Sequence, residues 1–127
     1  MSSEENKELI RRYLDAGCGK PKPESMLRLF IDENEPLIEH IRVCELAFPL
    51  YRMDVEEIIA DSDLVSVRGM VRGTHMGEFA GIPATGKEVV FSIFITYRIS
   101  GGKIVDHWML TDNLALMKQI GAIPAAA

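Results

Sequence analysis

The chain has 127 residues, of which 47% are hydrophobic and 26% are charged, and its formal net charge is −5. This length predicts a single domain, residues 1–127, because two separate cores would need a longer chain. The composition is typical of a globular protein, and no apolar run approaches the roughly 20 residues of a membrane span. The acidic balance and the scattered basic residues disfavour nucleic acid as a partner, since phosphate binding needs a basic surface.

The N-terminus and the cysteines indicate in which cellular compartment the protein is expected. The opening MSSEENKELIRRY is polar and acidic before it is apolar, which is unlike a secretory signal. Cys18 and Cys44 form neither a C-x-x-C motif nor a disulfide framework. We therefore expect a cytoplasmic protein with two free thiols and no membrane association.

Helical spacing dominates the first half of the chain. Ser2 and Glu5 are typical of a capping box at the start of the first helix. GCGKPKP (17–23) interrupts helical structure, and DENEP (32–36) starts a further helix that Pro49 ends. The predicted helices span residues 3–16, 24–30, 36–47 and, near the C-terminus, 113–119.

The second half changes to the alternating period of β-strands. The predicted strands span residues 52–60, 64–75, 87–99 and 103–111. ADSD (60–63) and SGG (100–102) are turn-forming and predict two hairpins. Helices followed by an antiparallel meander indicate an α+β fold, in which the helices cover one face of the sheet. The concave space of such a sheet is either a pocket or filled by side chains.

GIPATGKE (81–88) is close to the phosphate-binding pattern G-x-x-x-x-G-K-[ST]. That loop needs a helix after it, whereas the β-branched VVFSIFITYRI follows here, and Glu88 replaces the hydroxyl that binds magnesium. The stretch therefore reads as a connection between strands. His40, His75 and His107 lack the spacing of metal ligands, and no nucleophile motif is present. Acid–base chemistry without metal or cofactor is the simplest enzymatic hypothesis.

Asp112 lies between the last predicted strand and the last predicted helix. Alternation places it on the strand face of Trp108, and His107 on the opposite face, unless a β-bulge changes the parity. If the Trp108 face lines the concave space, Asp112 is a carboxylate at the edge of an apolar pocket, where burial raises its pKa toward that of a useful base. The alternative is that Asp112 only caps the helix, since Asp is a favoured N-cap residue.

Several motifs resemble the SnoaL-like polyketide cyclase family of the NTF2-like superfamily. The matching stretches are RGTHMGEF (72–79), GIPATGK (81–87), YRISGGKIVDHW (97–108), Asp112 and QIG (119–121). With AFP (47–49) and VEEIIADSDLVSVRG (55–69), they extend the resemblance over about residues 37–122. The chain departs from the family pattern at Leu50, at Ala84 and in GCGKPKPESM (17–26), which concerns the pocket rim and the substrate more than the fold.

The resemblance implies an NTF2-like cone, in which N-terminal helices pack into a strongly curved antiparallel sheet around an internal pocket. It also implies an intramolecular aldol condensation of an aromatic polyketide ester without metal or cofactor, with an acid–base aspartate that corresponds to Asp112. The candidate substrate-binding residues are Tyr13, His75, Trp108 and His107. Each of these has an alternative role in core packing or in a structural hydrogen bond.

Several functions stay open on the sequence alone. One is a cofactor-free cyclase or isomerase-type enzyme that acts on a small hydrophobic or aromatic carbonyl compound, with epoxide or ester hydrolysis as a related chemistry. Another is a non-catalytic small-molecule binding module, and a third is an interaction protein whose cone is filled by side chains. The apolar stretch 89–99 and the relatives predict a homodimer through the sheet, or a tetramer.

Overall fold

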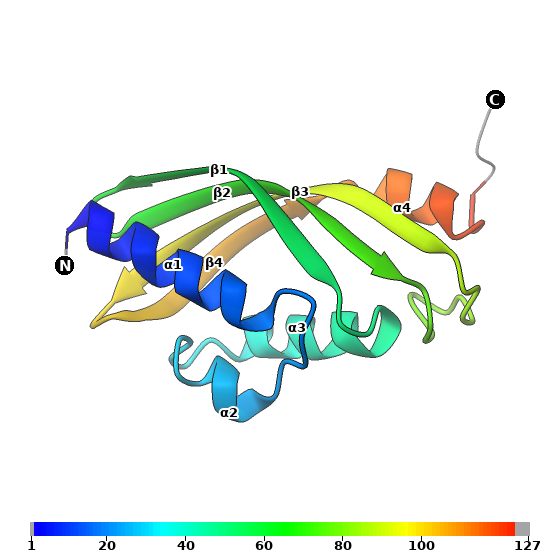
Figure 1. The fold of residues 1–127 in the computed structure, drawn as a ribbon, viewed down its shortest axis with the longest axis horizontal. Helices are drawn as coiled ribbons and strands as arrows, with labels where there is room; N and C mark the ends of the chain where they lie inside the picture. The colour runs from blue at the N-terminus through cyan, green and yellow to red at the C-terminus, as the bar shows by residue number, and fades with distance from the viewer. Residues whose placement is uncertain (1, 124–127) are drawn as a thin grey trace.

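A computed structural model describes residues 2–123. Its helices are α1 (Ser3–Gly17), α2 (Glu24–Leu27), α3 (Glu35–Ala47) and α4 (Asn113–Gln119) (Figure 1). Its strands are β1 (Arg52–Asp61), β2 (Leu64–Thr74), β3 (Glu88–Ser100) and β4 (Lys103–Thr111). The predicted strands are confirmed to within one residue at each end, because turn residues mark the limits of each strand.

Local hydrogen bonds fix the helix starts. The Glu5 N–H donates to the Ser2 hydroxyl at 3.1 Å, and the Ser2 N–H donates to the Glu5 carboxylate at 3.2 Å, so the predicted capping box is confirmed. α3 begins after Asn34, whose side chain accepts a hydrogen bond from the Leu37 N–H. Pro36 lies in the first turn of α3, where a helix does not need its missing N–H.

α2 is shorter than the predicted helix 24–30. The chain after Leu27 turns to run beside β4, where Ile31 forms a parallel bridge with Ile104. The Ile104 N–H donates to the Phe30 carbonyl at 2.7 Å, and the Asp32 N–H donates to the Ile104 carbonyl at 2.9 Å. Residues 28–30 still form a hydrogen-bonded turn, in which the Ile31 N–H donates to the Leu27 carbonyl at 2.9 Å. The bonds to Ile104 and the burial of Ile31 then draw the chain out of the helix.

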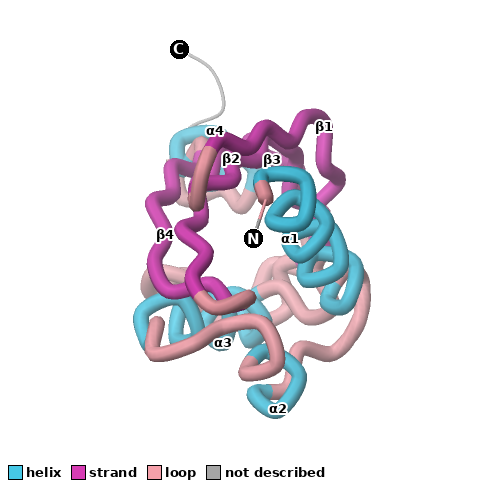
Figure 2. The backbone as a smooth tube through the Cα atoms, turned by 90° about the vertical axis from the view of Figure 1, so that its left-hand side faces the viewer, coloured by secondary structure: helices cyan, strands magenta, loops and turns pink. Residues whose placement is uncertain are grey.

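The strands form one curved, unclosed antiparallel sheet in the order β1-β2-β3-β4, and the two predicted hairpins are confirmed. α1, α2 and α3 lie on one side of this sheet, and α4 lies at its end (Figure 1). Figure 2 shows the strands curving over α1 and α3. The helix-covered side is called the inner face below, and the opposite side the outer face.

Two β-bulges bend the sheet. One separates Val55 from Glu57 in β1, and the other leaves Val105 of β4 without a partner on β3. Gly69 of β2 faces the first bulge, and a Cβ atom there would lie 2.6 Å from the Asp54 carbonyl oxygen. Only glycine therefore fits where β1 and β2 bend together.

The inner face carries two hydrophobic clusters. One joins α1, α2 and α3 to the sheet, and the other joins the end of α3 and α4 to β2 and β3. Met53 and Met109 pack against both clusters. The predicted α+β fold, with helices packed into a curved antiparallel sheet, is confirmed. None of the helices in residues 2–123 has the length and apolar character needed to cross a membrane.

Candidate functional site

The inner face of β4 brings a histidine and a tyrosine together. His107 of β4 is opposite Tyr97 of β3 in the strand register, so the two side chains lie on the same face. Tyr97 is almost completely buried, and His107 is half-buried beneath the start of α3. The two residues form a polar strip on an otherwise apolar surface.

The predicted parity of β4 is wrong beyond its bulge. Ile104 is fully buried on the inner face, but the unpaired Val105 shifts the alternation by one residue. Trp108 therefore lies on the outer face and is 49% exposed, so it is not a wall of an internal pocket. His107, expected on the face opposite the pocket, lies on the inner face instead.

α3 holds the His107 ring. Its Nδ1 lies 2.9 Å from the Asn34 side-chain nitrogen, and Asn34 is buried. Burial lowers the pKa of His107, and the neighbouring Asp106 carboxylate raises it by less. The imidazole is therefore neutral at pH 7.

A second histidine lies near the first. His40 of α3 places its Nε2 3.5 Å from the Cys44 sulfur, one helical turn away. Burial, and then the proximity of His107, lower the pKa of His40. Burial raises the pKa of the Cys44 thiol to about 11, with Glu45 adding to the effect. Both groups are uncharged at pH 7, and Cys44 is not activated as a nucleophile.

Tyrosines line the remainder of this interior. Tyr13 of α1 packs edge-on against Tyr97, with 5.8 Å between the ring centroids. Burial raises the pKa of Tyr13, of Tyr51 and of Tyr97, so all three are phenols rather than phenolates. Tyr13 is buried in the hydrophobic core of the inner face, and its contact with a substrate stays a prediction.

A cavity of about 40 Å³ lies among α1, α2, α3 and the start of β1. Its lining includes Tyr13, Cys18, Leu27, Ile41, Tyr51 and Met53. Lys22 closes one side, where its ammonium nitrogen lies 2.8 Å from the Glu45 carboxylate and 4.0 Å from the centre of the Tyr51 ring. A typical small-molecule pocket has roughly 300 Å³ or more, so this cavity is too small for such a ligand in this conformation.

His75 is enclosed rather than placed at a pocket mouth. It is fully buried beside Phe48, with 5.5 Å between the ring centroids. Its Nδ1 lies 3.0 Å from the Thr85 hydroxyl, and its Nε2 has no hydrogen-bond partner among residues 2–123. The ring thereby joins the end of β2 to the loop before β3, and in this position it faces no open space.

Asp112 joins β4 to α4. The Ala115 N–H donates to its Oδ1 at 3.0 Å, so the helix cap weighed from the sequence is present. The carboxylate is exposed to solvent. The bulge at Val105 precedes both Trp108 and Asp112, so the two keep the same strand parity, but that parity belongs to the outer face and not to the concave space. Five residues of strand at about 3.3 Å each separate the α-carbons of His107 and Asp112 by about 16 Å.

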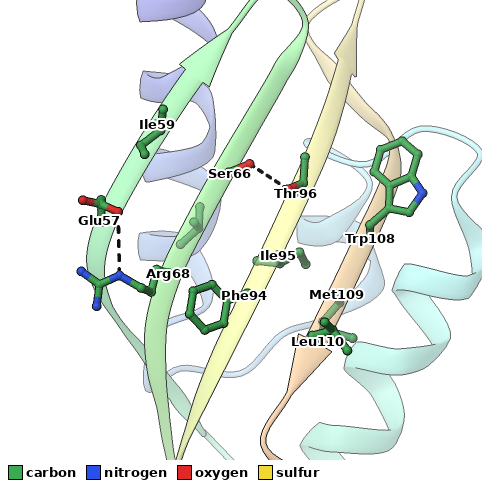
Figure 3. Close-up of a pocket in the computed structure, with 11 residues that line it drawn as sticks. Glu57, Ile59, Ser66, Arg68, Phe94, Ile95, Thr96, Trp108, Met109 and Leu110 are labelled. Atoms are coloured by element: carbon green, nitrogen blue, oxygen red, sulfur yellow. Dashed lines mark hydrogen bonds and ion pairs between the residues drawn. The ribbon is translucent and has the colours of Figure 1, made fainter.

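An open groove of about 500 Å³ crosses the outer face (Figure 3). Apolar side chains fill its middle, from Ile59 of β1 through Phe94 of β3 to Trp108 and Leu110 of β4. The Arg98 guanidinium lies 5.1 Å from the centre of the Trp108 ring. This surface is wide and shallow, unlike the enclosed inner face.

The sequence prediction did not include two of the polar residues around His107, namely Asn34 and Tyr97. Asn34 is recognisable only as a helix start, and Tyr97 only as one residue of a long strand. The SGG hairpin pairs Tyr97 with His107, but only if the bulge at Val105 is known. Nowhere in residues 2–123 do His, Cys, Asp and Glu side chains gather as a metal site.

Solved structures share this fold. AclR from Streptomyces galilaeus, proposed to be a hydroxylase, is 24% identical with a TM-score of 0.87 over 99% of this chain and 87% of that chain. A proposed SnoaL-like polyketide cyclase from Jannaschia sp. CCS1 is 24% identical with a TM-score of 0.84, over 96% and 95% of the chains. IdmH from Streptomyces antibioticus, a proposed polyketide cyclase, is 25% identical with a TM-score of 0.76, over 91% and 98%. These likenesses show the NTF2-like fold.

The family comparison is more specific than the fold. No curated protein sequence matches the chain significantly. The sequence model of the SnoaL-like polyketide cyclase family matches residues 25–120, which include all four strands and both His107 and Asp112. The resemblance inferred from the motifs is confirmed, and the chain belongs to the SnoaL-like polyketide cyclase family.

Proposed function

We propose that this chain catalyses a cofactor-independent acid–base reaction of the polyketide cyclase type. The reaction is an intramolecular aldol condensation, or a related isomerisation, of a small hydrophobic or aromatic carbonyl compound. The observation that carries the proposal is the inner strip of β3 and β4, where the neutral imidazole of His107 lies opposite the phenol of Tyr97. Fixed N–H and O–H donors in a dry site stabilise the oxyanion of an enolate.

Asp112 is the proton acceptor in this proposal. Its carboxylate removes a proton from the carbon between two carbonyl groups, and the enolate carbon attacks a carbonyl carbon of the same molecule to form a C–C bond. The alkoxide then takes the proton back from Asp112, so the step consumes no cofactor, oxidant or reductant. The helix cap occupies Oδ1 on the Ala115 N–H, which leaves Oδ2 for the proton.

The spacing of these groups favours an extended substrate. The α-carbons of His107 and Asp112 are about 16 Å apart, and the alternation of β4 places His107 on the inner face and Asp112 on the side of Trp108. A molecule that reaches both must therefore extend past the end of β4, where Asp112 begins α4. Met109 lies between His107 and Asp112 on the inner face and, like Met53, packs against both core clusters. Unbranched methionine side chains adapt readily, so we expect these two to move when the closed interior admits a ligand.

Asp112→Asn separates the chemical role from the cap. Asparagine caps helices about as well as aspartate, so the stability should change by only a few tenths of a kcal/mol. The amide is not a base, and turnover should fall by about 10²–10⁴-fold. Asp112→Ala is the matched control, because it removes both the base and the cap and should cost about 1 kcal/mol of stability.

The probes are aromatic β-dicarbonyl compounds. The enol–keto interconversion of benzoylacetone reports proton transfer, and aromatic diketone methyl esters report ring closure. Acceleration by the wild-type protein that Asp112→Asn abolishes supports the proposal. Binding of benzoylacetone without acceleration makes the chain a non-catalytic binding module, and release of a carboxylic acid from the esters makes it a hydrolase. Addition of an oxygen atom to the ester would instead match the hydroxylase function proposed for AclR.

The exposed apolar residues of the outer face support an interface with a partner protein. Phe94, Trp108 and Leu110 are exposed side by side on an uncovered sheet surface. Exposed apolar patches of this kind mark protein interfaces, and a second copy of the chain is the partner we propose. Cys18 and Cys44 are both free, which supports a cytoplasmic location, where thiols stay reduced.

A further inference from the structure

Asn34 contacts two groups that require different ends of its amide. As the N-cap of α3, its Oδ1 accepts a hydrogen bond from the Leu37 N–H at 3.4 Å. Its Nδ2 lies 2.9 Å from Nδ1 of His107, a residue 73 positions away in the sequence. The helix start thereby reaches across to the inner face of β4.

The cap determines which way the amide points. A backbone N–H can only donate, so the atom facing Leu37 must be the amide oxygen. The atom facing His107 is then the NH₂ group, which can only donate. Exchanging the two ends would place donor against donor at the Leu37 N–H, and because Asn34 is buried, water does not relieve that loss.

The amide in turn determines the tautomer of the imidazole. Since Asn34 donates to Nδ1, that nitrogen must carry a lone pair, and the proton of the neutral ring lies on Nε2. A protonated His107 would bring an Nδ1–H against the Asn34 NH₂ group. The contact therefore favours the neutral ring as well as one tautomer, in the same direction as burial.

We infer that Asn34 is a positioning residue that holds His107 as the neutral Nε2–H tautomer, so that the ring presents an N–H donor to a substrate carbonyl. This inference rests on the proposed function for the role of the N–H, but the tautomer itself follows from the contacts of Asn34. The arrangement assigns His107 to stabilisation of the enolate oxygen rather than to proton removal. It leaves proton removal to Asp112.

Asn34→Asp places an acceptor instead of a donor against Nδ1 of His107 and keeps an N-cap residue for α3. Aspartate is an N-cap as good as asparagine, so α3 should stay folded. A carboxylate accepts only, so the His107 proton should move to Nδ1. In ¹⁵N-histidine NMR at a pH where the ring is neutral, the pyrrole-type signal should change from Nε2 in the wild type to Nδ1 in the variant. The pKa of His107 should rise, with Asp106 unchanged and His40 the other titrating neighbour.

Asn34→Ser is the matched control. Serine also caps a helix but is too short to bond to the ring, so stability should be retained while both tautomers of His107 appear. Turnover of the aromatic diketone esters should fall by about 10²–10³-fold in Asn34→Asp, the loss typical of one oxyanion donor.

The NMR readout separates the inference from the proposed function. A wild-type ring protonated on Nδ1, or an Asn34→Asp ring still protonated on Nε2, overturns the inference whatever the activity. If the tautomer changes as stated and the wild-type protein has no turnover, the tautomer assignment stands and the proposed function fails. If the tautomer changes and turnover does not, Asn34 has no positioning role in the reaction.

Discussion

Leu110→Asp tests the outer face as a homodimer interface. Leu110 is 76% exposed and lies with Phe94 and Trp108, which are 54% and 49% exposed. In a two-fold dimer both copies contribute the same residues, so one substitution acts twice. We expect the wild-type protein to be a dimer and Leu110→Asp to dissociate it without unfolding the chain.

The exposed aromatic rings set the scale of the effect. An aromatic side chain has about 200 Å² of surface, so two half-exposed rings in each of two copies offer roughly 400 Å². At about 25 cal/mol per Å² this area contributes about 10 kcal/mol, which is similar to the cost of association. Neighbours such as Leu110 therefore decide whether the dimer forms. Leu110→Asp should remove about 2 kcal/mol of association free energy per copy, which raises the dissociation constant about 10³-fold.

Sedimentation equilibrium across the micromolar range measures this dissociation constant. Leu29→Asp is the matched control, since Leu29 is 69% exposed but follows α2 and does not line the outer groove. Thermal unfolding checks that both variants are folded. A wild-type protein that is monomeric at every concentration, or equal dissociation by both substitutions, would refute the assignment of this face.

Three further predictions concern stability. Gly69→Ala brings a methyl group within 2.6 Å of the Asp54 carbonyl oxygen and should lower the free energy of urea unfolding by about 2–3 kcal/mol. The control Gly81→Ala, with a φ of +81° and open space around it, should lower it by only about 1 kcal/mol. Equal losses of stability in the two variants would argue against the close approach at Gly69. Lys22→Met removes the ion-pair partner of the Glu45 carboxylate, which keeps only its hydrogen bond from the Leu50 N–H. It should cost about 2 kcal/mol, part of which Glu45→Gln restores; a single variant as stable as the wild type would contradict this. Because burial lowers the pKa of His40 and of His107, the unfolded chain binds more protons than the folded chain as the pH falls through about 6.5, so stability should decrease there. His107→Gln should reduce this slope, and a flat stability profile in the wild type would count against the buried neutral rings.

The secondary structure was predictable because its limits depend on local chemistry. Ser2 with Glu5 starts α1, Pro36 lies in the first turn of α3, and SGG closes a hairpin. α2 was predicted too long, since its end depends on bonds between residues 30–32 and Ile104, far away in the sequence. Long-range pairing of this kind leaves no periodic signal.

The candidate site was less predictable, for one main reason. Ile104 and Val105 are both typical strand residues, so nothing in the local pattern marks Val105 as the extra residue of a bulge. A single unpaired residue exchanged the faces of His107 and Trp108. The contact between Asn34 and His107 likewise depends on the packing of α3 against β4 and not on sequence spacing.

The central claim is that a carbonyl ligand binds on the inner face of β4. Titration of the protein with benzoylacetone, followed by NMR of labelled methionine methyl groups and by tryptophan fluorescence, tests it directly. Met53 and Met109 report the interior, and Trp108, the only tryptophan in the chain, reports the outer face. We predict that the Met53 and Met109 signals shift while Trp108 emission stays unchanged. A change in Trp108 emission without any shift of the two methionines would contradict the account.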